Sequence, residues 1–144
     1  MGHRKRVLVV DDEPEVRRAV AGILADAGHD VQTAIDGDHA LRSALALAPD
    51  CILLDIRLPE PSFALRFAER YRQRVAPDQR APIIALSGGA DIAPLSKQLG
   101  ASAFVAKPFA VQDLLAIVEG CLAAGLGEGR AAGDAPASQR TPTG

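Results

Sequence analysis

The stretch Lys5-Arg6-Val7-Leu8-Val9-Val10-Asp11-Asp12-Glu13-Pro14 decides how the rest of this chain is interpreted. Its apolar part, from Val7 to Val10, has no polar interruption, which is typical of a strand that is buried on both faces. Pro14 lacks an N–H and has a fixed φ, so it favours the first turn of a helix. We therefore expect the acidic residues to stand at the carboxyl end of a strand, where open α/β sheets bind ligands.

Two interpretations of these acidic residues are open at this point. Adjacent carboxylates repel one another unless a cation neutralises them, and oxygen ligands suit Mg²⁺. Alternatively, the acidic residues could simply begin a helix, because a helix N-terminus favours negative charge. The rest of the chain has to decide between a metal site and a plain helix start.

Four more apolar segments follow the first one, and a helical pattern stands after each of the five. The expected strands cover 7–10, 30–34, 51–55, 82–87 and 103–106, and the expected helices cover 14–27, 36–48, 62–75, 94–99 and 110–124. This alternation is typical of βαβ units, in which helices cover both faces of a parallel sheet. Because such crossovers are right-handed, we predict an α/β fold with a doubly wound, five-stranded parallel sheet of flavodoxin-like order.

Length and composition exclude several classes of function. The chain has 144 residues and a formal net charge of −2, which predicts one domain and gives no reason to expect nucleic-acid binding. No apolar run approaches the ~20 residues that a membrane span needs, and the short apolar run after the basic N-terminus does not fit a signal peptide. We therefore expect a cytoplasmic protein that binds neither nucleic acid nor membranes.

Residues 1–124 are expected to form the domain, and residues 125–144 are expected to form a disordered tail. The tail is rich in Gly, Ala and Pro and nearly lacks large apolar residues, so burial cannot offset its ordering entropy. The two cysteines, Cys51 and Cys121, stand in apolar contexts. They are predicted to be buried free thiols in a reducing compartment.

Polar residues also follow the other strands. Because the carboxyl ends of parallel strands share one edge of the sheet, these residues should meet there. In strand order they are Asp11 and Asp12, Asp55, Ser87 and Lys107. A carboxylate can act as a nucleophile toward phosphorus, while a hydroxyl and an ammonium can contact phosphoryl oxygens. Together with a divalent cation, this combination suits phosphoryl transfer.

These motifs resemble the receiver domain of two-component response regulators, in the form of a single-domain, chemotaxis-type receiver. The resemblance covers about residues 5–122 and rests on Asp11-Asp12, on Asp55 after Leu53-Leu54, on Ser87 after Ile83-Ile84-Ala85-Leu86, and on Lys107-Pro108-Phe109. Each motif is weak alone, but their order at four strand ends is specific. The resemblance implies a phosphoprotein of a phosphorelay that promotes its own phosphorylation and dephosphorylation and is not a turnover enzyme.

The resemblance further implies a separate role for each acidic residue. Asp55 is implied to be the phosphoacceptor. Asp12, Asp55 and the backbone carbonyl of Arg57 are implied to ligate Mg²⁺ (or Mn²⁺), and Asp11 to hold a metal-bound water. Glu13 is expected only to favour the helix N-terminus.

The remaining motif residues are implied to respond to the phosphoryl group. Ser87 and Lys107 would contact that group, and before it arrives Lys107 could pair with Asp55 or Asp12. Phe104 matches an aromatic switch position, and we favour that role although an aromatic residue in a strand is on general grounds more often core. Arg57 and Gly89 match positions that tune the lifetime of the phosphoryl group.

The implied partners are a histidine kinase or histidine phosphotransfer protein as donor, and a downstream protein or a second copy of the chain as target. The output face would consist of the fourth helix, the fifth strand and the fifth helix. Two alternatives stay open. One is a phosphorylation-independent interaction module, and the other is a Mg²⁺-dependent phosphohydrolase, which would need an acid where Arg57 stands.

Two departures from the family pattern motivate the interaction-module alternative. Phe63 stands where a glycine is usual, so we expect a rebuilt loop in which Pro61 and Ser62 begin the third helix. Phe63 also opens an aromatic series with Phe67 and Tyr71 at helical spacing. The segment before Lys107 is short, so the fourth helix is expected to begin near residue 94.

Overall fold

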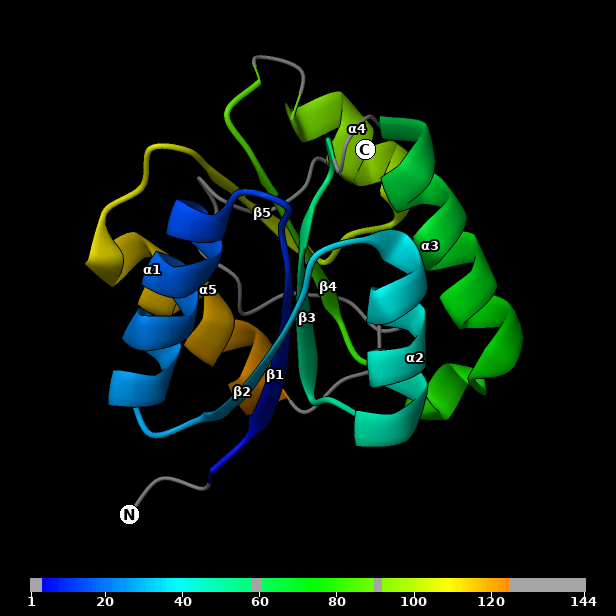
Figure 1. Cartoon of the computed structure of the whole chain (residues 1–144), viewed down its shortest axis with the longest axis horizontal. Coiled ribbons are helices and arrows are strands. Elements are labelled where there is room, and N and C mark those ends of the chain that lie inside the picture. Colours follow the sequence, from blue (N-terminus) through cyan, green and yellow to red (C-terminus); the bar gives the residue numbers. More distant parts are fainter. Residues whose placement is uncertain (1–3, 58–60, 90–91, 125–144) are drawn as a thin grey trace.

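A computed structural model of the chain describes residues 4–57, 61–89 and 92–124, and it contains one sheet with helices on both faces (Figure 1). Along the chain the elements are β1 Arg6–Val10, α1 Pro14–Asp26, β2 Asp30–Ala34, α2 Gly37–Leu47, β3 Cys51–Asp55, α3 Pro61–Arg74, the 3-10 helix η1 Pro77–Gln79, β4 Ile83–Ser87, α4 Ile92–Leu99, β5 Ala103–Ala106 and α5 Val111–Ala124. All neighbouring strands are parallel, in the order β2-β1-β3-β4-β5. The predicted doubly wound, flavodoxin-like fold is confirmed.

The strands separate two cores because successive side chains point to opposite faces. In β1, Leu8 and Val10 belong to the cluster under α2, α3 and α4, whereas Val7 and Val9 belong to the cluster under α1 and α5. Figure 1 shows the same division, with α1 and α5 on one side of the sheet and α2, α3 and α4 on the other. Burial on both faces explains why β1 has no polar residue between Val7 and Val10.

The strand register brings the predicted site residues to one edge of the sheet. Val10 lies opposite Leu54, so the residues that follow each of them, Asp11 and Asp55, continue side by side. In the pair formed by β4 and β5, Ser87 lies opposite Ala106, and Lys107 is the residue that follows Ala106. A single parallel register therefore delivers residues far apart in sequence to the same place.

Of the two helix starts that the departures from the family pattern concern, one agrees with the sequence-based expectation and one differs from it. Helix α3 begins at Pro61, as predicted, but α4 begins at Ile92 and not near Pro94. Pro94 fits in the first turn because the N–H groups of that turn have no partner within the helix. The buried Ile92 adds apolar contact to this turn and helps to extend the helix backward.

The aromatic series on α3 is only partly buried. Phe67 and Tyr71 are stacked with ring centroids 6.0 Å apart, and the Tyr71 hydroxyl accepts a hydrogen bond from the Ala81 amide. Phe63, the first residue of the series, is 41% exposed. The Arg66 guanidinium lies over the Phe63 ring, 5.6 Å from the ring centroid.

The two cysteines are buried free thiols, as predicted. Burial raises the pKa of the Cys121 thiol to about 11. The predicted tail, residues 125–144, lies outside the described residues, and so do residues 58–60 of the loop before α3. Within the described part of the chain, no helix has the length and apolar character that crossing a membrane requires.

Candidate functional site

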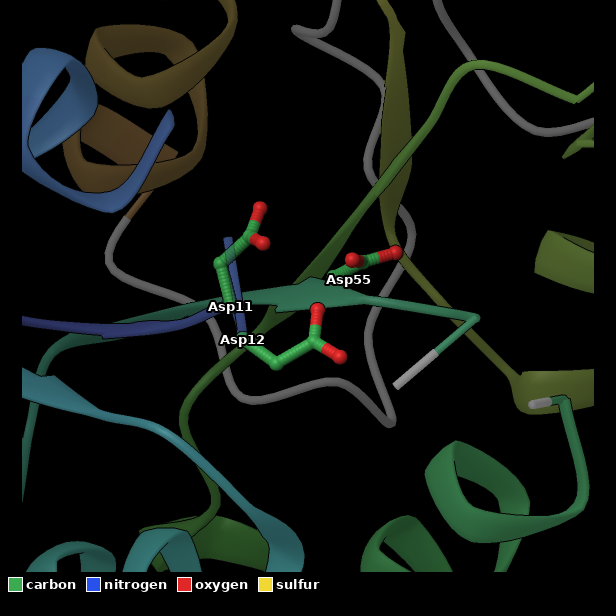
Figure 2. Close-up of side chains that lie close together, drawn as sticks. All are labelled: Asp11, Asp12 and Asp55. Carbon is green, nitrogen blue, oxygen red and sulfur yellow. The ribbon is translucent and has the colours of Figure 1, made fainter. Parts of the chain in front are cut away.

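Three aspartates form a cluster at the carboxyl edge of the sheet. Asp11, Asp12 and Asp55 each offer one carboxylate oxygen, and these oxygens all lie within 4.8 Å of one another. Figure 2 shows Asp11 and Asp12 after the end of β1 and Asp55 at the end of β3, with their carboxyl groups gathered at the same edge. Asp11 and Asp55 are buried, while Asp12 is exposed. The cluster is therefore open to solvent on one side.

Backbone amides orient the two buried carboxylates. The Asp11 Oδ1 atom accepts a hydrogen bond from the Glu13 amide at 2.9 Å, where Glu13 is the N-cap residue of α1. The Asp55 Oδ1 atom accepts one from the Arg57 amide at 3.0 Å. In both cases a residue two positions along the chain turns its N–H back onto the aspartate, so local backbone geometry positions the carboxylates.

The Lys107 ammonium lies among three carboxylates. Its Nζ atom is 3.0 Å from Asp11 Oδ2, 3.0 Å from Glu13 Oε1 and 3.7 Å from Asp55 Oδ2. The predicted pairing with Asp55 is present as the longest contact, and Asp12 is not among the described ion-pair partners of this lysine. Glu13 was expected only to favour the start of α1, and that expectation was incomplete because its carboxylate also binds Lys107.

Burial and neighbouring charges shift two pKa values in this site. Burial raises the pKa of Asp55 from 3.8 to about 6, and the nearby Asp11 and Asp12 act in the same direction, whereas the Arg57 amide and Lys107 oppose them. Burial alone would lower the pKa of Lys107, but its contacts with Asp11, Asp55 and Glu13 raise it. The lysine is therefore charged, and the Asp55 carboxylate is held in a site with too little positive charge.

The other predicted site residues flank this cluster. Ser87 is buried at the end of β4, and its Oγ atom accepts a hydrogen bond from the Gly89 amide at 3.0 Å. The Lys107 amide donates to the Ser87 carbonyl at 2.8 Å, which joins the ends of β4 and β5. Phe104 lies on β5, partly buried against the core cluster under α2, α3 and α4. Arg57 is exposed beyond Asp55.

Comparisons with known proteins agree on one family. The sequence model described as the response regulator receiver domain matches residues 7–119. The transcriptional regulatory protein DltR of Streptococcus agalactiae is 37% identical over 113 residues, which cover 77% of this chain and 49% of DltR. The nitrogen assimilation regulatory protein NtrX of Azorhizobium caulinodans is 36% identical over 122 residues, which cover 81% of this chain and 26% of NtrX. The chain thus spans about half or less of the length of these curated relatives.

Solved structures show the same likeness. The chemotaxis response regulator CheY4 of Vibrio cholerae superposes with a TM-score of 0.71 at 30% identity, over 83% of this chain and 100% of that one. NtrX of Brucella abortus, solved in complex with ATP, gives a TM-score of 0.76 at 33% identity, over 85% of this chain and 28% of that one. With the family match over most of its length, this chain belongs to the response regulator receiver domains of two-component systems.

Proposed function

We propose that this receiver accepts a phosphoryl group on Asp55 from a phosphohistidine. The observation that carries the proposal is the position of Asp55, whose buried carboxylate stands between two other aspartates and the Lys107 ammonium. Receiver domains in general are not turnover enzymes. The chemistry proposed here is accordingly a single transfer onto the chain itself.

The two oxygens of Asp55 have different surroundings, which supports Oδ2 as the reacting atom. Oδ1 accepts a hydrogen bond from the Arg57 amide, whereas Oδ2 lies 3.7 Å from the Lys107 ammonium. In the transfer, an Asp55 oxygen forms the new bond to phosphorus as the phosphorus–nitrogen bond of the phosphohistidine breaks. The histidine nitrogen keeps the electron pair and takes up a proton. Lys107 then stabilises the negative charge on the phosphoryl oxygens.

Receiver domains bind Mg²⁺ in an acidic pocket, and the residues of this cluster fit that ion. Mg²⁺ prefers oxygen ligands, and three carboxylates of the described residues can converge on one point. We propose that Asp12, Asp55 and the Arg57 carbonyl would hold the ion directly and that Asp11 would hold it through water. When bound, the ion would neutralise charge on the phosphoryl group. The exposed Asp12 leaves an entry path from solvent.

The proposed readout of the phosphoryl group passes through Ser87 and Phe104. The Ser87 hydroxyl would donate a hydrogen bond to a phosphoryl oxygen, which is compatible with its contact to the Gly89 amide because Oγ is the acceptor there. Arg57 and Gly89 would tune the access of water. Phe104 is partly buried, so it has room to become more buried and to bias α4, β5 and α5 between two states. A histidine kinase or histidine phosphotransfer protein is the proposed donor. A protein target or self-association is the proposed output.

Several expectations stay predictions. They are the division into a domain (1–124) and a tail (125–144), and the cytoplasmic setting. The curated relatives named above are regulators that are longer than this chain. The regulatory roles that their names state are proposed for this chain only in the part that concerns the receiver.

A mass measurement tests the phosphoacceptor directly. Incubating the protein with Mg²⁺ and a small phosphodonor such as acetyl phosphate should add the mass of one phosphoryl group, and Asp55→Asn should abolish the addition because an amide is a poor nucleophile. Asp78→Asn is the matched control, since Asp78 is an exposed aspartate of η1 outside the cluster. Equal labelling of Asp55→Asn and wild type would refute the proposal and favour a phosphorylation-independent interaction module.

A further inference from the structure

The contacts of Lys107 are unequal, and one of them involves a residue to which the phosphorylation chemistry assigns no role. Its ammonium lies 3.0 Å from both Asp11 and Glu13 but 3.7 Å from Asp55. The ammonium is therefore closer to the carboxylates of Asp11 and Glu13 than to Asp55, the proposed phosphoacceptor. A phosphoryl group on Asp55 would draw the ammonium toward Asp55 and away from at least one of these carboxylates.

The Glu13 side chain contacts Lys107 and does not belong to the cluster of three aspartates. The carboxylates of the described residues that can converge on one ion are those of Asp11, Asp12 and Asp55, and Glu13 is not among them. Its backbone serves a separate purpose, because its amide binds Asp11 Oδ1. The side chain of Glu13 can therefore be changed while the hydrogen bond of its amide is kept.

Burial decides which contact Lys107 can give up. The Asp11 side chain is 0% exposed, so without the ammonium its carboxylate would lose a partner that water cannot readily replace. The Glu13 side chain is 61% exposed, and water can take the place of the lysine on it. The contact with Glu13 is the cheaper one to break, and the lysine can keep Asp11 while it moves.

We propose that Glu13 is a positioning residue that holds Lys107 back from Asp55 until a phosphoryl group competes for it. The proposal rests on the proposed phosphoacceptor function of Asp55. Removing the negative charge of Glu13 frees the ammonium and favours the phosphorylated arrangement of the site. Because an exposed ion pair stabilises only modestly, the expected gain in affinity for a phosphoryl group or its mimic is about two- to five-fold.

Beryllofluoride, a non-covalent mimic of the phosphoryl group, provides the test. The chain has no tryptophan, so binding is measured by ¹⁹F NMR of the bound mimic at saturating Mg²⁺. Glu13→Gln should bind beryllofluoride about two- to five-fold more tightly than wild type. Glu15→Gln is the matched control, because Glu15 is an exposed acid of the same first turn of α1, and its affinity should equal that of wild type.

Salt dependence separates this electrostatic role from a merely structural one. The difference between Glu13→Gln and wild type should shrink as ionic strength rises, because salt screens an exposed ion pair. Urea unfolding of both proteins checks that the fold is equally stable. Equal or weaker binding by Glu13→Gln, or an equal gain in Glu15→Gln, would overturn the proposal. Failure of the wild type itself to bind beryllofluoride would instead contradict the function proposed for Asp55.

Discussion

At the scale of single residues, the Asp55 carboxylate stands in an environment that disfavours its charged form and so lowers the stability of the fold. Asp55 is 5% exposed and lies close to two further carboxylates, while one amide and one ammonium oppose the repulsion. Without a metal ion the deprotonated carboxylate is therefore disfavoured, which is why its pKa rises to about 6. A structural aspartate would be expected to have a lowered pKa, so this direction is typical of a functional group.

The raised pKa of Asp55 predicts that Asp55→Asn stabilises the metal-free protein. The folded state binds the Asp55 proton more tightly than the unfolded chain does, with pKa values of about 6 and 3.8. This contribution to stability is fully present below the unfolded value and is lost as pH rises through the folded one. At pH 7.5 the variant should be more stable by about 1–3 kcal/mol, since one pKa unit corresponds to about 1.4 kcal/mol.

Urea unfolding in EDTA, repeated from pH 7.5 down to pH 4, measures this difference. The stability gap between Asp55→Asn and wild type should close as pH falls, and saturating Mg²⁺ should reduce it at pH 7.5. A gap that is independent of pH would show that the substitution acts on packing and not on charge.

At the scale of elements, arginines close the ends of two helices. Arg80 donates to the carbonyls of Val75 and Arg72 at the end of α3, and Arg72 donates to the Gly100 carbonyl after α4. The last carbonyls of a helix lack partners within it, so side-chain donors of this kind satisfy them. Gly100 has φ +78, and a Cβ there would lie 2.7 Å from the Arg72 guanidinium. This junction between α3 and α4 therefore depends on a glycine.

Three glycine-to-alanine substitutions separate the effects of backbone and packing. Gly100→Ala should destabilise by about 1–3 kcal/mol because it combines a positive φ with a close approach to Arg72. Gly28→Ala, with φ +98 and open space around the new Cβ, should cost only the backbone strain of about 1–2 kcal/mol.

Gly22→Ala is the control with the opposite sign. Gly22 is exposed within α1 and has open space around a new Cβ, so alanine should stabilise by about 0.5–1 kcal/mol. Urea unfolding ranks the three variants. A Gly100→Ala protein as stable as Gly28→Ala would mean that Arg72 moves aside without loss.

At the scale of the whole molecule, the site joins parts of the fold that pack separately. Helices α1 and α5 share one core and α2, α3 and α4 share the other, with the sheet between them. The cluster draws Asp11 and Asp12 from the end of β1, Asp55 from β3 and Lys107 from the end of β5. A ligand bound at this edge therefore stabilises the sheet as a unit.

Mg²⁺ is accordingly expected to raise the melting temperature of the wild-type protein. A ligand that binds only the folded state stabilises it by about 2.7 kcal/mol at a hundred times its dissociation constant. Asp12→Asn removes one proposed ligand from the exposed side of the cluster and should lose most of this gain, whereas Asp78→Asn should keep it. Differential scanning calorimetry with and without Mg²⁺ measures the effect, and an equal gain in Asp12→Asn would exclude Asp12 as a ligand.

Much of the fold was predictable from the opening stretch and its counterparts. Fully buried strands leave an unbroken apolar run in the sequence, and β1 and β3 were located on that signal alone. The start of α4 could not be located in the same way. Pro94 indicates that a helix begins nearby, but proline is tolerated at any position of the first turn, so it does not fix the first residue.

The sequence by itself determined which residues stand at the carboxyl edge of the sheet, because a parallel sheet brings every carboxyl end of a strand to the same side. Only the tertiary structure decided how they share their charges. Nothing in the order of Asp11, Asp12 and Glu13 states that the first is buried, the second exposed and the third bound to Lys107. Those distinctions depend on distances of a few ångströms and on access to water, and both arise only when β1, β3 and β5 are packed together.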